Sequence, residues 1–147
     1  MVTKAEEKKL RILIVDDDPQ MADVVKISAK KAGYETQILT DSVAAKEALE
    51  KESYDVLLTD LRMPKVSGLE LVKTAVTVDP TMKIIIITGN GLKEDAVQAI
   101  RYGVFDFLDK PFSIPKLEIV LKNAMDLKRA EDAREELLAI IKGMTSP

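Results

Sequence analysis

The strongest indication of the fold comes from residues 11–19, which have the sequence Arg-Ile-Leu-Ile-Val-Asp-Asp-Asp-Pro. The first five are mostly apolar without alternation, which is typical of a strand buried on both faces, as in a parallel sheet covered by helices. The run then stops at three carboxylates and a proline. Asp18 before Pro19 is the expected start of a helix, because an aspartate caps the first turn and proline fits its first position. The stretch therefore predicts a buried strand that leads directly into a helix.

The same alternation continues along the chain. Further apolar runs lie at residues 36–39, 56–59, 83–88 and 105–108. Segments with helical spacing separate or follow them, at residues 19–32, 42–52, 68–78, 93–102 and from about 115 onward. Gly33 and Gly103 follow two of these segments, where left-handed C-terminal caps are expected. Strands that alternate with helices in this order predict an α/β fold built on an open, doubly wound parallel sheet.

The composition excludes several kinds of chemistry. The 147 residues include no cysteine and no histidine, which rules out thiolate nucleophiles, zinc fingers, iron–sulfur sites and histidine bases. A net charge of −3 and 4% aromatic residues argue against nucleic-acid binding by this chain. The charged residues 1–10 lack the apolar centre of a secretory signal, and no apolar run approaches the ~18 residues of a membrane span. We therefore expect a cytoplasmic protein with no membrane contact.

Polar residues follow four of the five apolar runs. They are Asp16 and Asp17 after the first run, Asp60 after the third, Thr88 at the end of the fourth, and Lys110 shortly after the fifth. Each has an ordinary structural explanation when taken alone, as a turn residue or a solvated side chain. Ligands of doubly wound sheets, however, bind outside the carboxyl ends of the strands, so we expect these side chains to meet there.

Three carboxylates at one sheet edge repel one another unless a cation lies among them. Mg²⁺ suits such hard oxygen ligands. A magnesium ion and Lys110 together can neutralise the oxygens of a transferring phosphoryl group, Thr88 can donate a hydrogen bond to one of them, and a carboxylate can be the nucleophile. The pattern favours the formation of an aspartyl phosphate without any histidine.

With these motifs, the chain resembles the receiver domain of bacterial two-component response regulators, most closely the receivers of enhancer-binding transcription activators. The resemblance covers residues 11 to about 126. The motifs that carry it are the opening stretch, Leu-Leu-Thr-Asp60-Leu-Arg-Met63-Pro64 with Gly68, the run ending in Thr88-Gly, and Asp109-Lys110-Pro111-Phe112 after Gly103. The resemblance implies a flavodoxin-like sheet of five parallel strands in the order 2-1-3-4-5. It also implies a phosphorylation-activated switch that catalyses only its own phosphorylation and dephosphorylation.

The resemblance implies a phosphoacceptor and a metal site. Asp60 corresponds to the aspartate that takes a phosphoryl group from the phosphohistidine of a sensor histidine kinase. Asp16, Asp17, Asp60 and the backbone carbonyl of Arg62 correspond to the Mg²⁺ site, with Asp16 acting largely through a bound water.

The resemblance also implies a switch. Lys110 corresponds to the lysine that pairs with a phosphoryl oxygen, placed by a cis peptide to Pro111. Thr88 and Phe107 correspond to the hydroxyl and the aromatic ring that report phosphorylation to the surface formed by residues 93–102, 105–108 and the last helix. Asn90 holds one of two variable positions that tune the lifetime of the aspartyl phosphate in the family.

The C-terminal part departs from the usual receiver, because helical sequence runs from residue 116 to about 142. We therefore expect a charged lead (1–10), a receiver domain (11–126) and a helical extension (127–147). Apolar residues recur in the extension at spacings of three and four, namely Leu127, Ala130, Ala133, Leu137 and Ile140. We expect a homodimer through this helix, assisted by the face of residues 93–108. The alternative is a solvated, frayed helix.

Two other classes of function fit part of the pattern. A haloacid-dehalogenase-type phosphatase would use Asp16 as nucleophile and Asp18 as acid and base. That class has a small glycine-containing turn where this chain has Pro19 and Gln20, and it leaves Asp60 without a role. A receiver-like interaction module that signals without phosphorylation would not need the complete acidic set. The order and spacing of the motifs favour the receiver.

Overall fold

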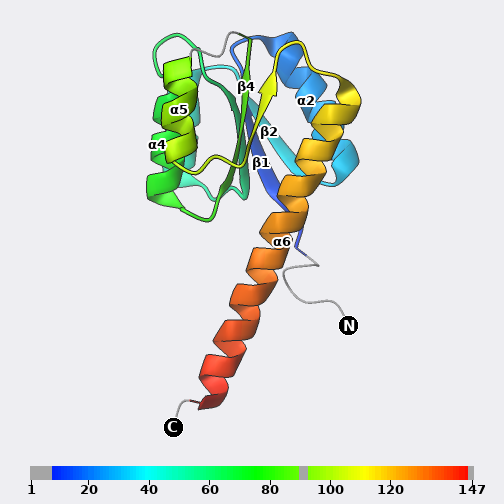
Figure 1. Cartoon of the computed structure of the whole chain (residues 1–147), viewed down its shortest axis with the longest axis vertical. Helices are drawn as coiled ribbons and strands as arrows, with labels where there is room; N and C mark the ends of the chain where they lie inside the picture. The colour runs from blue at the N-terminus through cyan, green and yellow to red at the C-terminus, as the bar shows by residue number, and fades with distance from the viewer. Residues whose placement is uncertain (1–7, 90–92, 146–147) are drawn as a thin grey trace.

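A sheet of parallel strands in the order β2-β1-β3-β4-β5 forms the centre of the structure (Figure 1). The computed structural model describes residues 8–89 and 93–145. The strands are β1 (Arg11–Val15), β2 (Glu35–Leu39), β3 (Val56–Asp60), β4 (Lys83–Thr88) and β5 (Asp106–Asp109). The order agrees with the expected doubly wound topology, and each strand lies within one residue of its predicted position.

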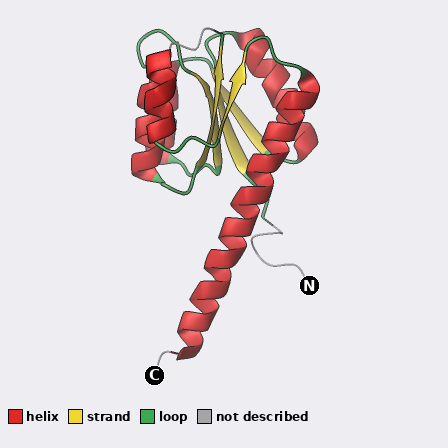
Figure 2. Cartoon of the chain, viewed as in Figure 1, coloured by secondary structure: helices red, strands yellow, loops and turns green. Residues whose placement is uncertain are grey.

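Helices cover both faces of this sheet (Figure 2). They are α2 (Pro19–Ala32), α3 (Ser42–Lys51), α4 (Gly68–Val78), α5 (Lys93–Arg101) and α6 (Ile114–Thr145). The helices α2 and α6 lie on one face, and α4 and α5 lie on the other. Among the described residues, no helix is both long and apolar enough to cross a bilayer.

Side chains that alternate along the strands build two separate cores. Ile12 and Ile14 of β1 pack with α2 and α6, whereas Leu13 and Val15 pack with α3 and α4. Successive side chains of a strand point to opposite faces, so a strand covered on both sides needs an apolar residue at every position. This requirement explains the unbroken apolar runs of β1 and β4, residues 12–15 and 84–87, whereas the edge strands β2 and β5 carry polar residues.

The helix ends follow local rules. The Asp18 side chain accepts a hydrogen bond from Gln20 N at 3.0 Å, with Pro19 in the first turn, as expected for the cap of α2. Gly33 and Gly103 have φ of +109° and +82°, the left-handed conformation that glycine adopts without strain. Helices α3 and α5 each end one residue before their predicted ends, because terminal turns are the least regular part of a helix.

The last helix is continuous and projects beyond the domain (Figure 1). Its first half packs on the sheet through Leu117, Leu121 and Ala124, which are fully buried. Apolar residues of its second half are exposed: Leu127, Leu137 and Ile140 of the predicted stripe, and also Leu138, Ile141 and Met144, which the predicted stripe omits.

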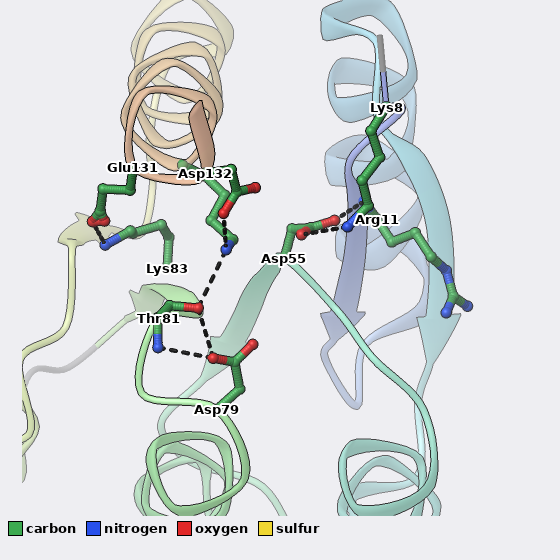
Figure 3. Close-up of polar contacts among 9 residues, drawn as sticks. Lys8, Arg11, Asp55, Asp79, Thr81, Lys83, Glu131 and Asp132 are labelled. Carbon is green, nitrogen blue, oxygen red and sulfur yellow. Dashed lines mark hydrogen bonds and ion pairs between the residues drawn. The ribbon is translucent and has the colours of Figure 1, made fainter. Parts of the chain in front are cut away.

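A polar network surrounds α6 where it passes the amino-terminal edge of the sheet (Figure 3). Lys128, with 5% of its surface exposed, donates from Nζ to Asp132 Oδ1 at 2.7 Å and to Thr81 Oγ1 at 3.2 Å. On the next turn, Glu131 pairs with Lys83, the first residue of β4. The same strand that ends at Thr88 is thus connected at its other end to α6.

Candidate functional site

The carboxyl ends of the parallel strands bring the predicted side chains to one edge of the sheet. Asp60 is the last residue of β3, and Asp16 directly follows β1, which pairs with β3. Both residues are buried, with 8% and 2% of their surfaces exposed. Asp17 is exposed at the same edge. One carboxylate oxygen of each of these residues lies within 4.8 Å of the other two. We call Asp16, Asp17 and Asp60 the acidic cluster.

Lys110 joins two members of the acidic cluster. Its Nζ donates to Asp60 Oδ2 at 2.7 Å and to Asp16 Oδ2 at 3.1 Å. The backbone N–H of Lys110 donates to the carbonyl of Thr88 at 2.9 Å, which places the start of the side chain beside the end of β4. The peptide bond between Lys110 and Pro111 is cis, as the resemblance implies.

The charges at this edge affect one another. Burial raises the pKa of Asp16 above its ordinary value, although a hydrogen bond from the Asp18 backbone and the contact with Lys110 act in the opposite direction. Burial alone would lower the pKa of Lys110, but hydrogen bonds to Asp60 and Asp16 and the charges of both outweigh it and raise this pKa. Lys110 is therefore a permanent cation at neutral pH.

The acidic cluster fits a magnesium ion. Its donors are hard carboxylate oxygens, and Mg²⁺ bonds such oxygens at about 2.1 Å in octahedral geometry, so that ligand oxygens lie ~3–4 Å apart. The spacing of the cluster is close to this, and the exposed Asp17 leaves one side open to water. Three carboxylates with one ammonium also leave excess negative charge at this edge, which a divalent cation would compensate.

The β3–α4 loop, residues 61–67, leads away from Asp60. The Arg62 N–H donates to Asp60 Oδ1 at 3.0 Å, so the Arg62 backbone lies beside the carboxylate. At the other end of the loop, Gly68 N donates to the Leu61 carbonyl at 2.9 Å. A Cβ on Gly68 would lie 1.9 Å from the Asp60 carbonyl oxygen. Only glycine therefore lets α4 begin against the end of β3.

Thr88 and Phe107 lie on neighbouring strands. Thr88 is buried at the end of β4 and pairs in register with Asp109, and Phe107 pairs with Ile86. Phe107 is half-buried and packs against the core on the α3 and α4 face. Because side chains alternate along a strand, Thr88 projects to the same face as Ile86, which belongs to that core. The predicted switch residues thus share one face of the sheet, while Asn90 lies outside the described residues.

Sequence reasoning missed Ser42 at this site. It is buried, at 3% exposure, and its hydroxyl bonds the backbone of the β3–α4 loop. A serine at the start of a helix resembles an ordinary capping residue, so the sequence carried no signal of this long-range contact.

The topology and the acidic cluster define a class, the doubly wound α/β proteins with a carboxylate site at the strand ends. The sequence model of a protein family, the response regulator receiver domain, matches residues 12–122 of the chain. The chain belongs to this family. Receiver domains of two-component response regulators are phosphorylation-activated switches that sensor histidine kinases phosphorylate.

Known relatives support the assignment. The chain is 34% identical over 121 residues to the response regulator protein PilR of Pseudomonas aeruginosa, covering 82% of this chain but 27% of PilR. It is 34% identical over 125 residues to the transcriptional regulatory protein FixJ of Bradyrhizobium diazoefficiens, covering 85% of this chain and 60% of FixJ. The chain therefore spans about a quarter of PilR and three fifths of FixJ. The comparisons give no support to a phosphatase or to a phosphorylation-independent module.

Solved structures agree with the fold. A CheY-like response regulator receiver domain protein of Methanospirillum hungatei superimposes with a TM-score of 0.79 at 31% identity, covering 84% of this chain and 99% of that one. NtrX of Brucella abortus superimposes with a TM-score of 0.78 at 28% identity, covering 88% of this chain and 30% of that one.

Proposed function

We propose that this receiver domain acts in the cytoplasm, where it accepts a phosphoryl group on Asp60 from a sensor histidine kinase and catalyses only this transfer and its own dephosphorylation. The contact between Lys110 Nζ and Asp60 Oδ2, at 2.7 Å, is the observation that carries the proposal. It puts a permanent cation where the oxygens of a phosphoryl group on Asp60 would lie.

The transfer balances without any further co-reactant. A carboxylate oxygen of Asp60 attacks phosphorus, an O–P bond forms, and the P–N bond of the kinase's phosphohistidine breaks. The imidazole nitrogen keeps the bonding electron pair, and the proton carried by the other ring nitrogen makes the leaving group neutral histidine. Burial of Asp60 at the strand end holds the nucleophile in one orientation.

The acidic cluster is the proposed Mg²⁺ site, completed by the backbone carbonyl of Arg62. A bound Mg²⁺ supplies positive charge to the oxygens of the transferring phosphoryl group. Both oxygens of Asp16 already accept hydrogen bonds, from Asp18 N at 2.9 Å and from Lys110 Nζ. As the resemblance implies, we assign Asp16 to act on the metal largely through water, and Asp17 and Asp60 are the proposed direct carboxylate ligands.

Thr88 and Phe107 are the proposed switch residues. The Thr88 hydroxyl donates to a phosphoryl oxygen on Asp60, and Phe107 repacks on the same face of the sheet. A ligand shifts a conformational equilibrium only through contacts that differ between the two states, and this hydroxyl supplies such a contact. The surface of α5, β5 and α6 changes as a result.

Intact-mass analysis after incubation with acetyl phosphate tests the phosphoacceptor. The wild-type chain gains one phosphoryl group when Mg²⁺ is present, and Asp60→Asn gains none. Asp109→Asn is the matched control, because it makes the same change at the exposed end of β5 and keeps the label. Labelling of Asp60→Asn equal to that of the wild type contradicts the proposal. So does the result expected of a phosphatase with Asp16 as nucleophile, in which Asp16→Asn loses the label while Asp60→Asn steadily hydrolyses acetyl phosphate.

A second copy of this chain is the proposed partner of the α6 extension, residues 127–147. The exposed residues at the a and d positions of a heptad are 127, 130, 134, 137, 141 and 144, which replace Ala133 and Ile140 of the predicted stripe and include one charged residue, Arg134. Leu127, Leu137, Ile141 and Met144 at these positions are exposed by 41% to 79%. A parallel pair of these helices buries this stripe, with the face of α5 and β5 assisting.

Sedimentation of the full-length chain tests the dimer. Leu137→Asp with Ile141→Asp places charges in the seam and should leave a monomer. Ala139→Asp adds a charge on the opposite side of the helix and should leave the dimer intact. A wild-type chain that stays monomeric at high micromolar concentration, with and without a phosphoryl mimic, contradicts this part of the proposal.

A further inference from the structure

The β3–α4 loop has an unusual conformation next to the acidic cluster. Lys65 has φ of +72°, the left-handed region that a residue with a Cβ rarely adopts. A lysine there persists only when the surroundings hold the backbone. The contact that does so in the middle of the loop comes from another part of the chain.

Ser42, the first residue of α3, contacts the loop on both sides of Lys65. Its hydroxyl donates to the Pro64 carbonyl at 2.7 Å and accepts from the Val66 N–H at 3.1 Å. The three residues Pro64, Lys65 and Val66 are consecutive, so one side-chain oxygen bridges the two backbone groups that enclose the left-handed turn. Ser42 itself is buried, at 3% exposure, whereas Pro64 is exposed and Val66 is half-buried, so the serine side chain is the shielded partner in each bond.

The hydroxyl of Ser42 is not needed to start its own helix. Asp41 is the N-cap of α3, and its side chain accepts from Val43 N at 3.1 Å. Ser42 also lies 22 and 24 residues from its two partners, so these bonds are tertiary contacts rather than local turn bonds.

We propose that Ser42 is a positioning residue for phosphorylation, which holds the β3–α4 loop so that the Arg62 backbone stays beside Asp60. This inference rests on the proposed function of Asp60 and Arg62. The loop is bonded at its start by Arg62 N to Asp60 Oδ1 and at its end by Gly68 N to the Leu61 carbonyl. Ser42 adds the bonds to the middle of the loop and connects the metal-binding backbone to α3.

Removing the hydroxyl leaves the Pro64 carbonyl and the Val66 N–H without their partner, and the loop then leaves its left-handed conformation in part of the molecules. The Arg62 carbonyl would be correctly placed in fewer molecules, and the apparent affinity for Mg²⁺ falls by the same factor. A loss of roughly tenfold is expected, as for other partners that orient a metal ligand.

Four variants of the full chain separate positioning from simple stability. Ser42→Ala removes the hydroxyl, and Ser42→Thr keeps one. Ser42→Val has the shape of threonine without the hydroxyl, and it serves in place of alanine if Ser42→Ala fails to fold. Ser67→Ala is the matched control: it removes the serine cap of α4, which accepts from Glu70 N, at the end of the same loop.

Three measurements are made on each variant: hydrogen exchange of the Val66 amide in metal-free protein, Mg²⁺ titration followed by NMR, and the free energy of unfolding in urea. We expect Ser42→Ala and Ser42→Val to exchange Val66 at least tenfold faster and to bind Mg²⁺ roughly tenfold more weakly. Ser42→Thr should restore both, and Ser67→Ala should lower stability without changing Mg²⁺ binding.

Wild-type Mg²⁺ affinity in both variants without the hydroxyl overturns the inference, and so does an equal loss in Ser67→Ala. The failure of the proposed function is a different result. If Asp60→Asn still takes up the label, Asp60 is not the phosphoacceptor, whereas the Val66 exchange rate and the Mg²⁺ titration still decide whether Ser42 positions the loop.

Discussion

The ammonium group of Lys110 lies 2.7 Å from Asp60 Oδ2, although the two residues are 50 positions apart in the sequence. Among the described residues, Lys110 is the cation that pairs directly with this carboxylate. Asp17 has no such contact with Lys110 in this part of the chain, although its oxygen is grouped with those of Asp16 and Asp60. Asp17 is therefore the member of the acidic cluster whose negative charge Lys110 does not compensate directly.

Asp17 and the adjacent Asp18 should differ sharply in function. Asp17→Asn should weaken Mg²⁺ binding strongly and leave the metal-free protein at least as stable, because it removes repulsion within the acidic cluster. Asp18→Ala should bind Mg²⁺ nearly as wild type but lose about 0.5–2 kcal/mol of stability, since it removes the cap of α2. Metal titration and urea unfolding of both variants measure this, and reversed results would mean that the roles of the two residues are exchanged.

The wild-type protein should be stabilised by Mg²⁺ itself. At a concentration one hundred times the dissociation constant, a ligand that binds only the folded state adds about 2.7 kcal/mol. Urea unfolding with and without Mg²⁺ measures the gain, which should vanish in Asp17→Asn and persist in Asp18→Ala. An equal gain with Ca²⁺ and Mg²⁺ in every variant would indicate non-specific screening instead.

Thr88→Ala should separate phosphorylation from signalling. The variant keeps the acidic cluster and Lys110, so it should still accept the phosphoryl group. Without the hydroxyl, the shift of residues 96–107 on phosphorylation should be largely lost, whereas Thr88→Ser should retain it. NMR spectra before and after treatment with acetyl phosphate provide the measurement, and identical shifts in wild type and Thr88→Ala would refute the assigned role.

Gly68→Ala should be one of the most damaging substitutions in the chain. Its Cβ would lie 1.9 Å from the Asp60 carbonyl oxygen and 2.6 Å from Leu61 Cα, both backbone atoms that cannot move aside cheaply. We expect a loss of about 3 kcal/mol or more. Gly143→Ala is the control, because nothing lies within 4 Å of its Cβ and alanine favours a helix. Equal stability of the two variants in urea would contradict the close approach of α4 to β3.

Removal of Asp132 should destabilise the fold more than removal of the positive charge of Lys128, with which it pairs (Figure 3). Asp132→Ala removes the carboxylate from the buried Lys128 ammonium, which keeps its hydrogen bond to the Thr81 hydroxyl. We expect this substitution to lower the free energy of unfolding by about 1–3 kcal/mol. Lys128→Met removes the charge and keeps most of the packing, so it should cost less. Lys122→Met, at an exposed position of the same helix, is the control. Urea unfolding measures all three, and a larger loss in Lys128→Met than in Asp132→Ala would contradict this asymmetry.

The contact between Lys128 and Asp132 also predicts how the free energy of unfolding changes at alkaline pH. Burial alone would lower the pKa of Lys128, but the hydrogen bond to Asp132 and the charges of Asp132, Asp55 and Asp79 raise it above its ordinary value of 10.5. The stabilisation is therefore complete below pH 10.5 and is lost as the pH rises through the higher pKa of the folded state. The wild-type chain should lose more unfolding free energy over this range than Lys128→Met.

The strands, the helix starts and the members of the acidic cluster could all be predicted from local patterns in the sequence. A strand buried on both faces must be apolar at its inner positions, as residues 12–15 and 84–87 are. Asp18 with Pro19 and Asp41 start helices through bonds within three residues, so their signals are also local. Parallel strands then bring their ends together, which is why Asp16, Asp60 and Lys110 could be expected to meet.

The side-chain contacts between distant parts of the chain could not be predicted from the sequence and became visible in the folded structure. Ser42 reaches Pro64 and Val66, and Lys128 reaches Thr81, 47 residues away. Such pairs depend on how helices lie over a sheet, and no periodicity or spacing along the chain encodes that placement. The same is true of the left-handed backbone at Lys65, which local preference opposes and which persists because a buried hydroxyl from another helix bonds the backbone on both sides of it.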